Sequence, residues 1–498
     1  TTGTSNVLLG SQAGDALTTG SHNVAVGRGA LGTEDTGGKN TAIGHEALNT
    51  LDAGGNGNDT AVGFEAGKAM TTGVANTLVG SQSGISLTSG SWNTSVGYNS
   101  LVNEDANGYN TAVGAGTLQT QNAGADAYNV AVGYNAGNDI TTGIKNTIIG
   151  GLAGGALTTS SENVVIGYGA LAAEDTRGKV VAIGYRALNQ QAADADTYNV
   201  AIGNQAGYSV TTGIQNTIIG GNAGDALTTG EKNIAVGYAA LGTEDTGSRN
   251  VAIGNAALFS LNYDGTGYNV AIGHTAGYSI TTGTLNTIVG GLAGQTITTG
   301  AKNTALGYQA LTSNADGSNS TAIGYRALLT QDPASAIDMY NVAVGHDAGL
   351  SVTTGVSNTF LGAQAGDAIT TAGYSVAIGH LALTSEDTAQ YNTAIGYKAL
   401  YTQNGGVANT VIGFQAGQFV TTGDDNTIIG GEAGDALTTG SNNIIIGHDA
   451  AASAVDVSNE ITLGDANISA FRCADQSIAA LSDGRDKSEV EESPYGLE

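Results

Sequence analysis

The 498-residue sequence is short of several residue types. It has one cysteine, two prolines, one tryptophan and only 15 lysine plus arginine residues, against 43 aspartate plus glutamate. A single cysteine excludes an intrachain disulfide framework and a multi-cysteine zinc site. A formal net charge of −28 repels a phosphate backbone, so we expect no nucleic-acid partner. No apolar run approaches the roughly 20 residues of a membrane span, so we expect no membrane insertion.

Glycine, by contrast, is abundant, with 79 residues, and it follows a repeat. A five-residue core, NTAIG at 40–44 or NVAVG at 129–133, occurs in 27 copies. Positions are counted below from its closing glycine, which is position 0. Successive motif glycines are usually 17 residues apart, and we call each such unit a coil. From Gly44 to Gly324, every fourth step between motif glycines is longer, with 19 or 21 residues, which adds a second period of 70 residues. The longer steps begin at Gly44, Gly114, Gly184, Gly254 and Gly324.

Two adjacent positions of the core are apolar. Position −1 is aliphatic in all 27 copies, and position −2 is apolar in 25, where it is usually alanine. Neighbouring residues of a strand point to opposite faces, so both faces of this strand are expected to be dry. A single solenoid has to bury only its inward face. The mostly small second stripe therefore predicts packing against symmetry mates, most simply in a homotrimer.

The repeat as a whole predicts an all-β protein, a parallel β-solenoid or β-roll of about 27 coils assembled as a homotrimeric fibre. Turns such as TTG at 71–73 close each coil, which we expect to hold two short strands. Coils stacked at about 4.8 Å would form a rod of roughly 130 Å. We assign residues 1–464 to this shaft and residues 465–482 to an aperiodic cap or neck.

Asparagine occupies position −4 in 22 of the 27 copies. We interpret it as a structural ladder or a turn former, with a row of bound ions as the alternative. Other residues replace it in five copies, as a tolerant structural role allows. Representative asparagines are Asn40, Asn146, Asn233 and Asn392; the replacements are Asp59, Val180, Ser320, Ser375 and Glu460.

Five of the six histidines occupy position +1, a position that eight tyrosines share. Mostly aromatic occupancy favours a stack of rings. The alternative is a metal site in which a trimer brings three copies of one histidine together, although we expect no cofactor. The histidines are His45, His274, His346, His380 and His448.

Acidic doublets such as Glu34–Asp35 recur with the longer period. We expect them to solvate an outer edge of the rod, with calcium binding as the alternative. The longer steps place extra residues in loops, which are either plain spacers or sites of receptor or glycan contact. No G-x-S-x-G or H-E-x-x-H motif occurs. The loops lie near 49–58, 119–128, 189–198, 259–268 and 329–340.

The segment SDGRDK at 482–487 resembles the Ser-Asp-x-Arg-x-Lys start of the C-terminal intramolecular chaperone of phage tail fibres and endosialidase-type tail spikes. The resemblance implies that residues 483–498 begin such a chaperone, which trimerises the fibre and then releases itself. It further implies that Ser482 is the nucleophile, that Lys487 activates it, and that the Ser482–Asp483 bond is cleaved. Beyond this single-turnover step, we expect no enzyme.

The repeats, which cover nearly the whole of 1–464, resemble the head repeats of trimeric autotransporter adhesins and repeats common in phage fibres, although the 17-residue period is longer than that of the typical adhesin repeat. Together the resemblances imply a structural phage tail-fibre shaft, located in the virion tail. It would bind a host-surface receptor or glycan and other tail proteins. The alternatives are a bacterial trimeric surface adhesin or extracellular filament, and a polysaccharide-degrading tail spike.

Overall fold

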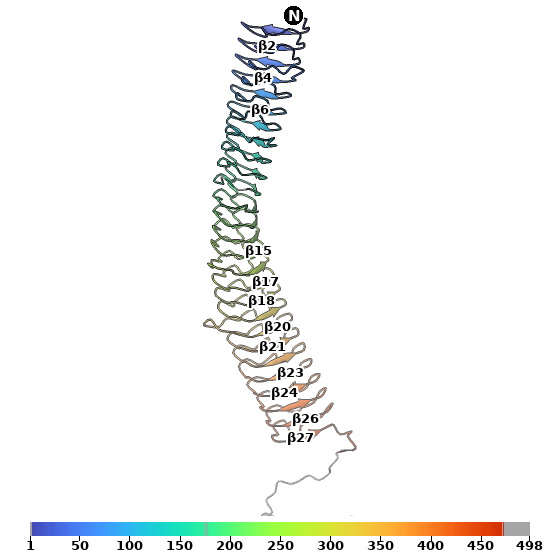
Figure 1. Cartoon of the computed structure of the whole chain (residues 1–498). Coiled ribbons are helices and arrows are strands. Elements are labelled where there is room, and N and C mark those ends of the chain that lie inside the picture. Colours follow the sequence, from blue (N-terminus) through green and yellow to red (C-terminus); the bar gives the residue numbers. More distant parts are fainter. Residues whose placement is uncertain (1, 175, 177, 471, 473–498) are drawn as a thin grey trace, which may run out of the picture.

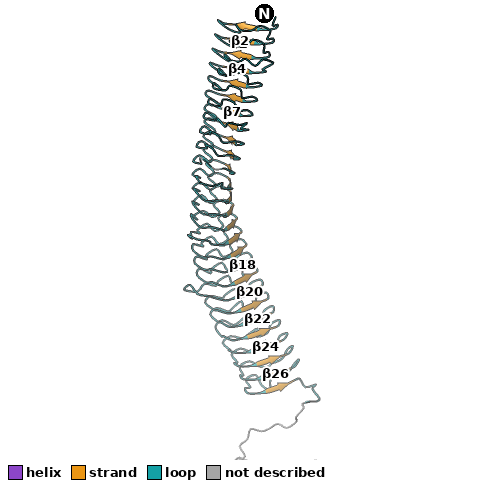
Figure 2. Ribbon diagram, in the orientation of Figure 1, coloured by secondary structure: helices purple, strands orange, loops and turns teal. Residues whose placement is uncertain are grey.

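A computed structural model describes residues 2–174, 176, 178–470 and 472. They form a long, gently curved rod of stacked coils (Figures 1 and 2). No helix among these residues is long and apolar enough to cross a membrane. Each strand has three residues, and the 27 strands are β1 Val7–Leu9, β2 Val24–Val26, β3 Thr41–Ile43, β4 Thr60–Val62, β5 Thr77–Val79, β6 Thr94–Val96, β7 Thr111–Val113, β8 Val130–Val132, β9 Thr147–Ile149, β10 Val164–Ile166, β11 Val181–Ile183, β12 Val200–Ile202, β13 Thr217–Ile219, β14 Ile234–Val236, β15 Val251–Ile253, β16 Val270–Ile272, β17 Thr287–Val289, β18 Thr304–Leu306, β19 Thr321–Ile323, β20 Val342–Val344, β21 Thr359–Leu361, β22 Val376–Ile378, β23 Thr393–Ile395, β24 Thr410–Ile412, β25 Thr427–Ile429, β26 Ile444–Ile446 and β27 Ile461–Leu463.

Each strand pairs in parallel with the next strand along the chain, which confirms the predicted parallel solenoid. In β10 and β11, for example, Val164 lies opposite Val181, so equivalent positions of successive coils meet. The longer steps leave this register unchanged, since Thr41 of β3 still faces Thr60 of β4 across a 19-residue step. The extra residues therefore bulge out as loops, and the sheet continues unbroken.

The prediction of two strands per coil was wrong, because each coil of the described chain contains one strand. The segment after the motif glycine turns instead of extending, with positive φ at positions +2 and +4, as at Arg186 (51°) and Leu188 (48°). These residues still bond to neighbouring coils: Arg186 N–H donates to Tyr168 O, and Leu188 N–H donates to Ala206 O. Residues in the left-handed conformation cannot continue the hydrogen-bonded pairing of extended strands, so this side of the coil is a stack of turns.

The predicted assignment of the two apolar stripes was also wrong. In every strand from β2 to β26 the central residue, position −2, is buried, and neither flanking residue is buried; Ala42 is fully buried while Ile43 is 38% exposed. The small stripe thus faces the core, and the larger aliphatic stripe faces outward. The physical reason is space, because positions +4 and +7 also fill the thin interior and leave room for little more than a methyl group at most strand centres.

The 70-residue period is a pattern of core volumes. Where position +4 is leucine, as at Leu188, the strand centre is small, here Ala182. Where position +4 is glycine, larger residues fill the space: a Cβ added to Gly137 would lie 3.0 Å from the Cδ1 atoms of both Ile140 and Ile148. Where glycine replaces leucine, larger side chains of the same and the next coil take up the space, so the core stays closely packed along the rod.

Candidate functional site

The asparagines at position −4 form a buried ladder along the rod. Asn146 donates from its backbone N–H to Asn129 Oδ1 (2.8 Å) and from Nδ2 to the Ser160 carbonyl (2.9 Å). Asn233 and Asn392 donate from Nδ2 in the same way, each to the carbonyl 14 residues further on (2.8 Å). The ladder thus runs mainly from side chain to backbone. An amide bonded in this way satisfies a buried donor and a buried acceptor that strand pairing leaves unused.

The ladder is incomplete in two of the coils that precede a longer step. Within the described chain, Nδ2 of Asn40 and of Asn110 has no hydrogen-bond partner. The carbonyl 14 residues further on, which accepts this bond in other coils, here falls within the longer loop. Val180 and Ser320 stand at position −4 of two other coils that precede a longer step. Two of the five replacements of asparagine therefore occur where the side-chain amide would have the fewest hydrogen-bond partners.

Replacing Asn216 with alanine is expected to cost about 2–6 kcal/mol, because it leaves the buried Asn233 N–H and the Gly230 carbonyl without partners, each worth roughly 1–3 kcal/mol. The matched control is Asn110→Ala, which removes only the 3.2 Å bond accepted from Asn129 N–H. We expect about half the cost or less there. Hydrogen exchange of the backbone amides around each substituted asparagine measures the loss of local stability in both variants. Equal losses of protection would contradict this account of the ladder.

The column of position +1 is largely an aromatic surface. His45 stacks on Phe64 with ring centroids 5.2 Å apart, His346 stacks on Tyr325 at 5.0 Å, and His380 is tilted against Tyr397 at 5.7 Å.

The other histidine contacts are polar. Arg28 Nε–H donates to His45 Nε2. Nδ1 of His274 lies 3.4 Å from Thr275 Oγ1, and Nδ1 of His448 lies 3.2 Å from an Asp449 oxygen. Among the described residues, one group of three or more histidine, cysteine, aspartate or glutamate side chains lies close enough together to hold a metal ion, and it contains none of these histidines.

The acidic doublets do not simply solvate an edge, as the sequence led us to expect. Their glutamates, at position +7, are fully buried: Glu34, Glu104, Glu174, Glu244 and Glu386. Among the described aspartates that follow, Asp35, Asp105 and Asp245 reach the surface.

Each buried glutamate has a specific set of donors. Glu104 accepts from Gln121 Nε2 (3.0 Å) and from Asn107. In the coil after Glu244, Leu261 stands at the position of Gln121 and offers no side-chain donor. Glu244 instead accepts from the backbone N–H groups of Gly247 and Tyr263. Burial nevertheless raises the pKa of Glu34, Glu104 and Glu244, because desolvation outweighs these bonds.

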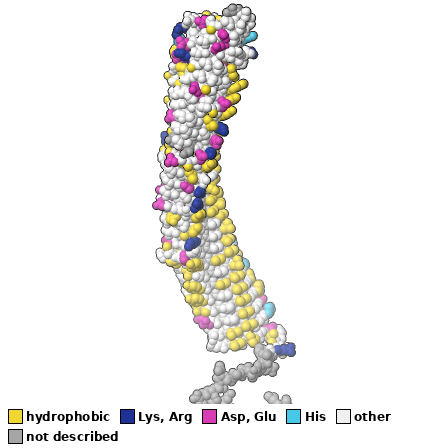
Figure 3. Space-filling view, viewed as in Figure 1, with side chains coloured by type: hydrophobic (Ala, Val, Ile, Leu, Met, Phe, Trp, Pro, Cys, Tyr) yellow, Lys and Arg dark blue, Asp and Glu magenta, His cyan; other side chains and the backbone are white. Residues whose placement is uncertain are grey.

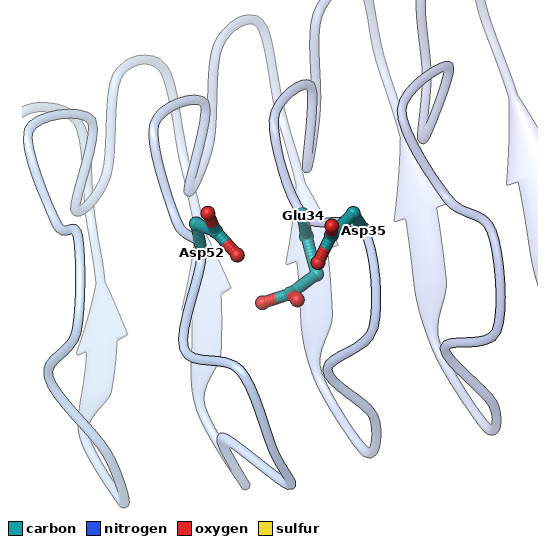
Figure 4. Close-up of side chains that lie close together, drawn as sticks. All are labelled: Glu34, Asp35 and Asp52. Atoms are coloured by element: carbon teal, nitrogen blue, oxygen red, sulfur yellow. The ribbon is translucent and has the colours of Figure 1, made fainter.

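The first 70-residue period of the rod contains an acidic cluster of Glu34, Asp35 and Asp52. One carboxylate oxygen from each side chain lies within 4.8 Å of the others. Figure 4 shows Glu34 and Asp35 on one coil and Asp52 on the next, with the three carboxylates turned toward one another. Glu34 already accepts from the Gly37 and Ala53 N–H groups, which holds this buried carboxylate in place without an ion.

Asp59 is the one buried carboxylate of the ladder among the described residues. Its Oδ1 accepts from Asn76 N–H (2.8 Å), as an asparagine Oδ1 would, while its Oδ2 has no partner within the described chain. Burial, with a smaller contribution from Glu34, raises its pKa to about 7. Oδ2 takes the place of the Nδ2 that, in other coils, donates to a carbonyl, so a protonated carboxyl can imitate the asparagine it replaces.

An apolar stripe runs along the outside of the sheet. It consists of position −1 of the strands, which is isoleucine, valine or leucine in every copy, flanked by position −3, which is threonine in about half of the strands and valine or isoleucine in the others. Leu306 and Leu361 at position −1 are 46% and 47% exposed. Rows of hydrophobic side chains follow the rod in the space-filling view (Figure 3). The sequence signalled this stripe but assigned it to the wrong face.

Ser482, Lys487 and the Ser482–Asp483 bond lie outside the described residues, so the self-cleavage prediction has no structural counterpart here. The predicted chaperone start at 483–498 lies outside them too. Comparison with known proteins adds no family: no protein-family model matches the chain, and no curated protein matches it significantly.

Proposed function

We propose that this protein is a structural fibre, the shaft of a phage tail fibre that mediates attachment to a host surface and assembles as a homotrimer. The observation that carries the proposal is the outer apolar stripe, which continues over the strands of a rod-shaped solenoid. A long rod acts as a spacer, and a continuous exposed aliphatic stripe on one side of it marks an interaction surface.

The size of the stripe fits self-association. A standard stable interface buries roughly 800 Å² per partner, which requires only about 30 Å² from each of 27 coils. Identical chains in register would set like stripes against each other along their whole length. The choice of a trimer and of a phage fibre rests on the resemblances of the repeat and of residues 482–487.

The wild-type chain, crosslinked or measured in its native state, is expected at three times the chain mass of 49.2 kDa. Placing lysine in the stripe with Ile219→Lys and Ile412→Lys buries unpaired charges and is expected to weaken association at least tenfold. The control places lysine in the same two coils at position −5, with Gln215→Lys and Ala408→Lys. Lysine already occupies that position at Lys145 and Lys232. A wild-type monomer, or equal weakening by both pairs, would refute the interface.

A further inference from the structure

A surface groove crosses the coils that hold β13 to β16, with a volume of about 470 Å³. It follows the column of position +5, in which Asp225, Gly242, Phe259 and Tyr278 succeed one another. Gly242 has no side chain, and the Phe259 ring packs over it, since a Cβ on Gly242 would lie 2.8 Å from the Phe259 Cε2 atom.

Aromatic faces form one part of the groove. Phe259 and Tyr278 stack with ring centroids 5.2 Å apart and planes only 9° from parallel. Tyr238, from position +1, is 62% exposed beside them. Ring faces carry partial negative charge and attract the weakly positive C–H groups of a flat apolar surface.

Polar side chains form the other part. Asn222 and Asn255 contribute planar amides that both donate and accept, and Asp225 contributes a half-buried carboxyl. This combination of aromatic surface with a few convergent polar groups, at this volume, is typical of a small-molecule site. The groove uses positions +1, +2 and +5, so it shares no residue with the outer apolar stripe.

We propose that this groove binds a short neutral glycan, whose C–H face packs on Phe259, Tyr278 and Tyr238 while its hydroxyls bond to Asp225, Asn222 and Asn255. Four stacked coils span roughly 14 Å, a length that suits an oligosaccharide lying along the rod. The chain's net charge of −28 and the carboxyl in the groove disfavour acidic sugars. The site rests on the proposed attachment function and names the class of receptor.

The test uses saturation-transfer NMR of the full chain with neutral di- and trisaccharides of glucose, galactose, mannose and N-acetylglucosamine, together with lactose and 3′-sialyllactose as a neutral and acidic pair. We expect at least one neutral sugar to bind, and Phe259→Ala to reduce its signal at least fivefold. The absence of binding by every neutral sugar, or stronger binding of 3′-sialyllactose than of lactose, would overturn the proposal.

Tyr238→Ala provides a second variant, which leaves the core intact because the ring is largely exposed. Its matched control is Tyr134→Ala, since Tyr134 also occupies position +1 and is 62% exposed, but lies outside the groove. We expect at least a fivefold loss of signal for Tyr238→Ala and less than a twofold change for Tyr134→Ala; equal effects would overturn the site. The chain mass in solution separates the two proposals, because a trimer without sugar binding refutes only the groove.

Discussion

Replacing Gly220 with alanine is expected to destabilise its part of the rod by on the order of 4 kcal/mol or more. Gly220 is a motif glycine at the end of β13 with φ of +136°, a region that only glycine adopts readily. An added Cβ would also lie 2.4 Å from the carbonyl oxygen of Gly237 in the next coil. Because the clash is between backbones, no side chain can turn aside to relieve it.

The next residue offers a matched control. Gly221 has no positive φ, and a Cβ added there would first meet Tyr238 Cδ2 at 3.6 Å, an ordinary contact distance. We therefore expect Gly221→Ala to change stability by less than about 1 kcal/mol. Hydrogen exchange of the coils around β13 distinguishes the two, because each coil contacts only its neighbours and the loss should be local. Equal protection in both variants would contradict the steric argument.

Replacing Asp59 with asparagine is expected to stabilise the fourth coil at pH 8 and above by up to about 4 kcal/mol. The folded-state pKa of Asp59 is about 7, against an ordinary value of 3.8, because burial opposes its charge. The substituted asparagine would carry no charge. It would also supply the Nδ2 donor that Asn129 uses, in the equivalent coil, to reach the Gly143 carbonyl at 2.8 Å.

The sign of the pH dependence follows from the raised pKa. Between about pH 3.8 and 7 the folded state holds the Asp59 proton more tightly than the unfolded state does, so stability falls as the pH rises. Below pH 3.8 both states are protonated and the penalty vanishes. Above about pH 7 both are ionised and the penalty is constant.

The measurement compares hydrogen exchange of residues 57–76 in wild type and Asp59→Asn from pH 5 to 9. The difference in opening free energy should grow up to about pH 7 and then level off. Glu34, Glu104 and Glu244 also have raised pKa values, but they are present in both proteins and largely cancel in the comparison. A difference that is constant with pH, or one that shrinks as the pH rises, would contradict a neutral buried Asp59.

Much of the fold was predictable because the repeat is strict. The regular 17-residue spacing of the motif glycine, with the same neighbours in each copy, predicted stacked parallel coils, and the register of β10 on β11 confirms it. The absence of a second strand from each coil was not predictable, because the residues after the motif glycine adopt positive φ although most are not glycine. Leucine at position +4, as at Leu188 with φ of 48°, carries no sequence signal for that conformation.

The candidate sites, like the fold, were predictable from the sequence only in part. The sequence alone picked out the asparagine column, the ring column and the acidic doublets, since each recurs at a fixed position. It could not show that Glu104 lies inside, because a glutamate beside an aspartate resembles a solvated edge until Gln121 of the next coil is seen donating to it. The groove was equally invisible, because it forms only where side chains of successive coils, among them Asn222, Tyr238 and Phe259, come together on the surface of the rod.

By itself, then, the sequence determined the period, the parallel stacking and the columns of like residues, because a 17-residue repeat brings the same position of every coil to the same side of the rod. Only the tertiary structure decided which columns face inward. That choice depends on the volume shared by positions −2, +4 and +7, so the small residue of each strand turns to the core and the larger aliphatic residue turns out. The outer stripe, and with it the case for a partner chain, follows from that limit on space.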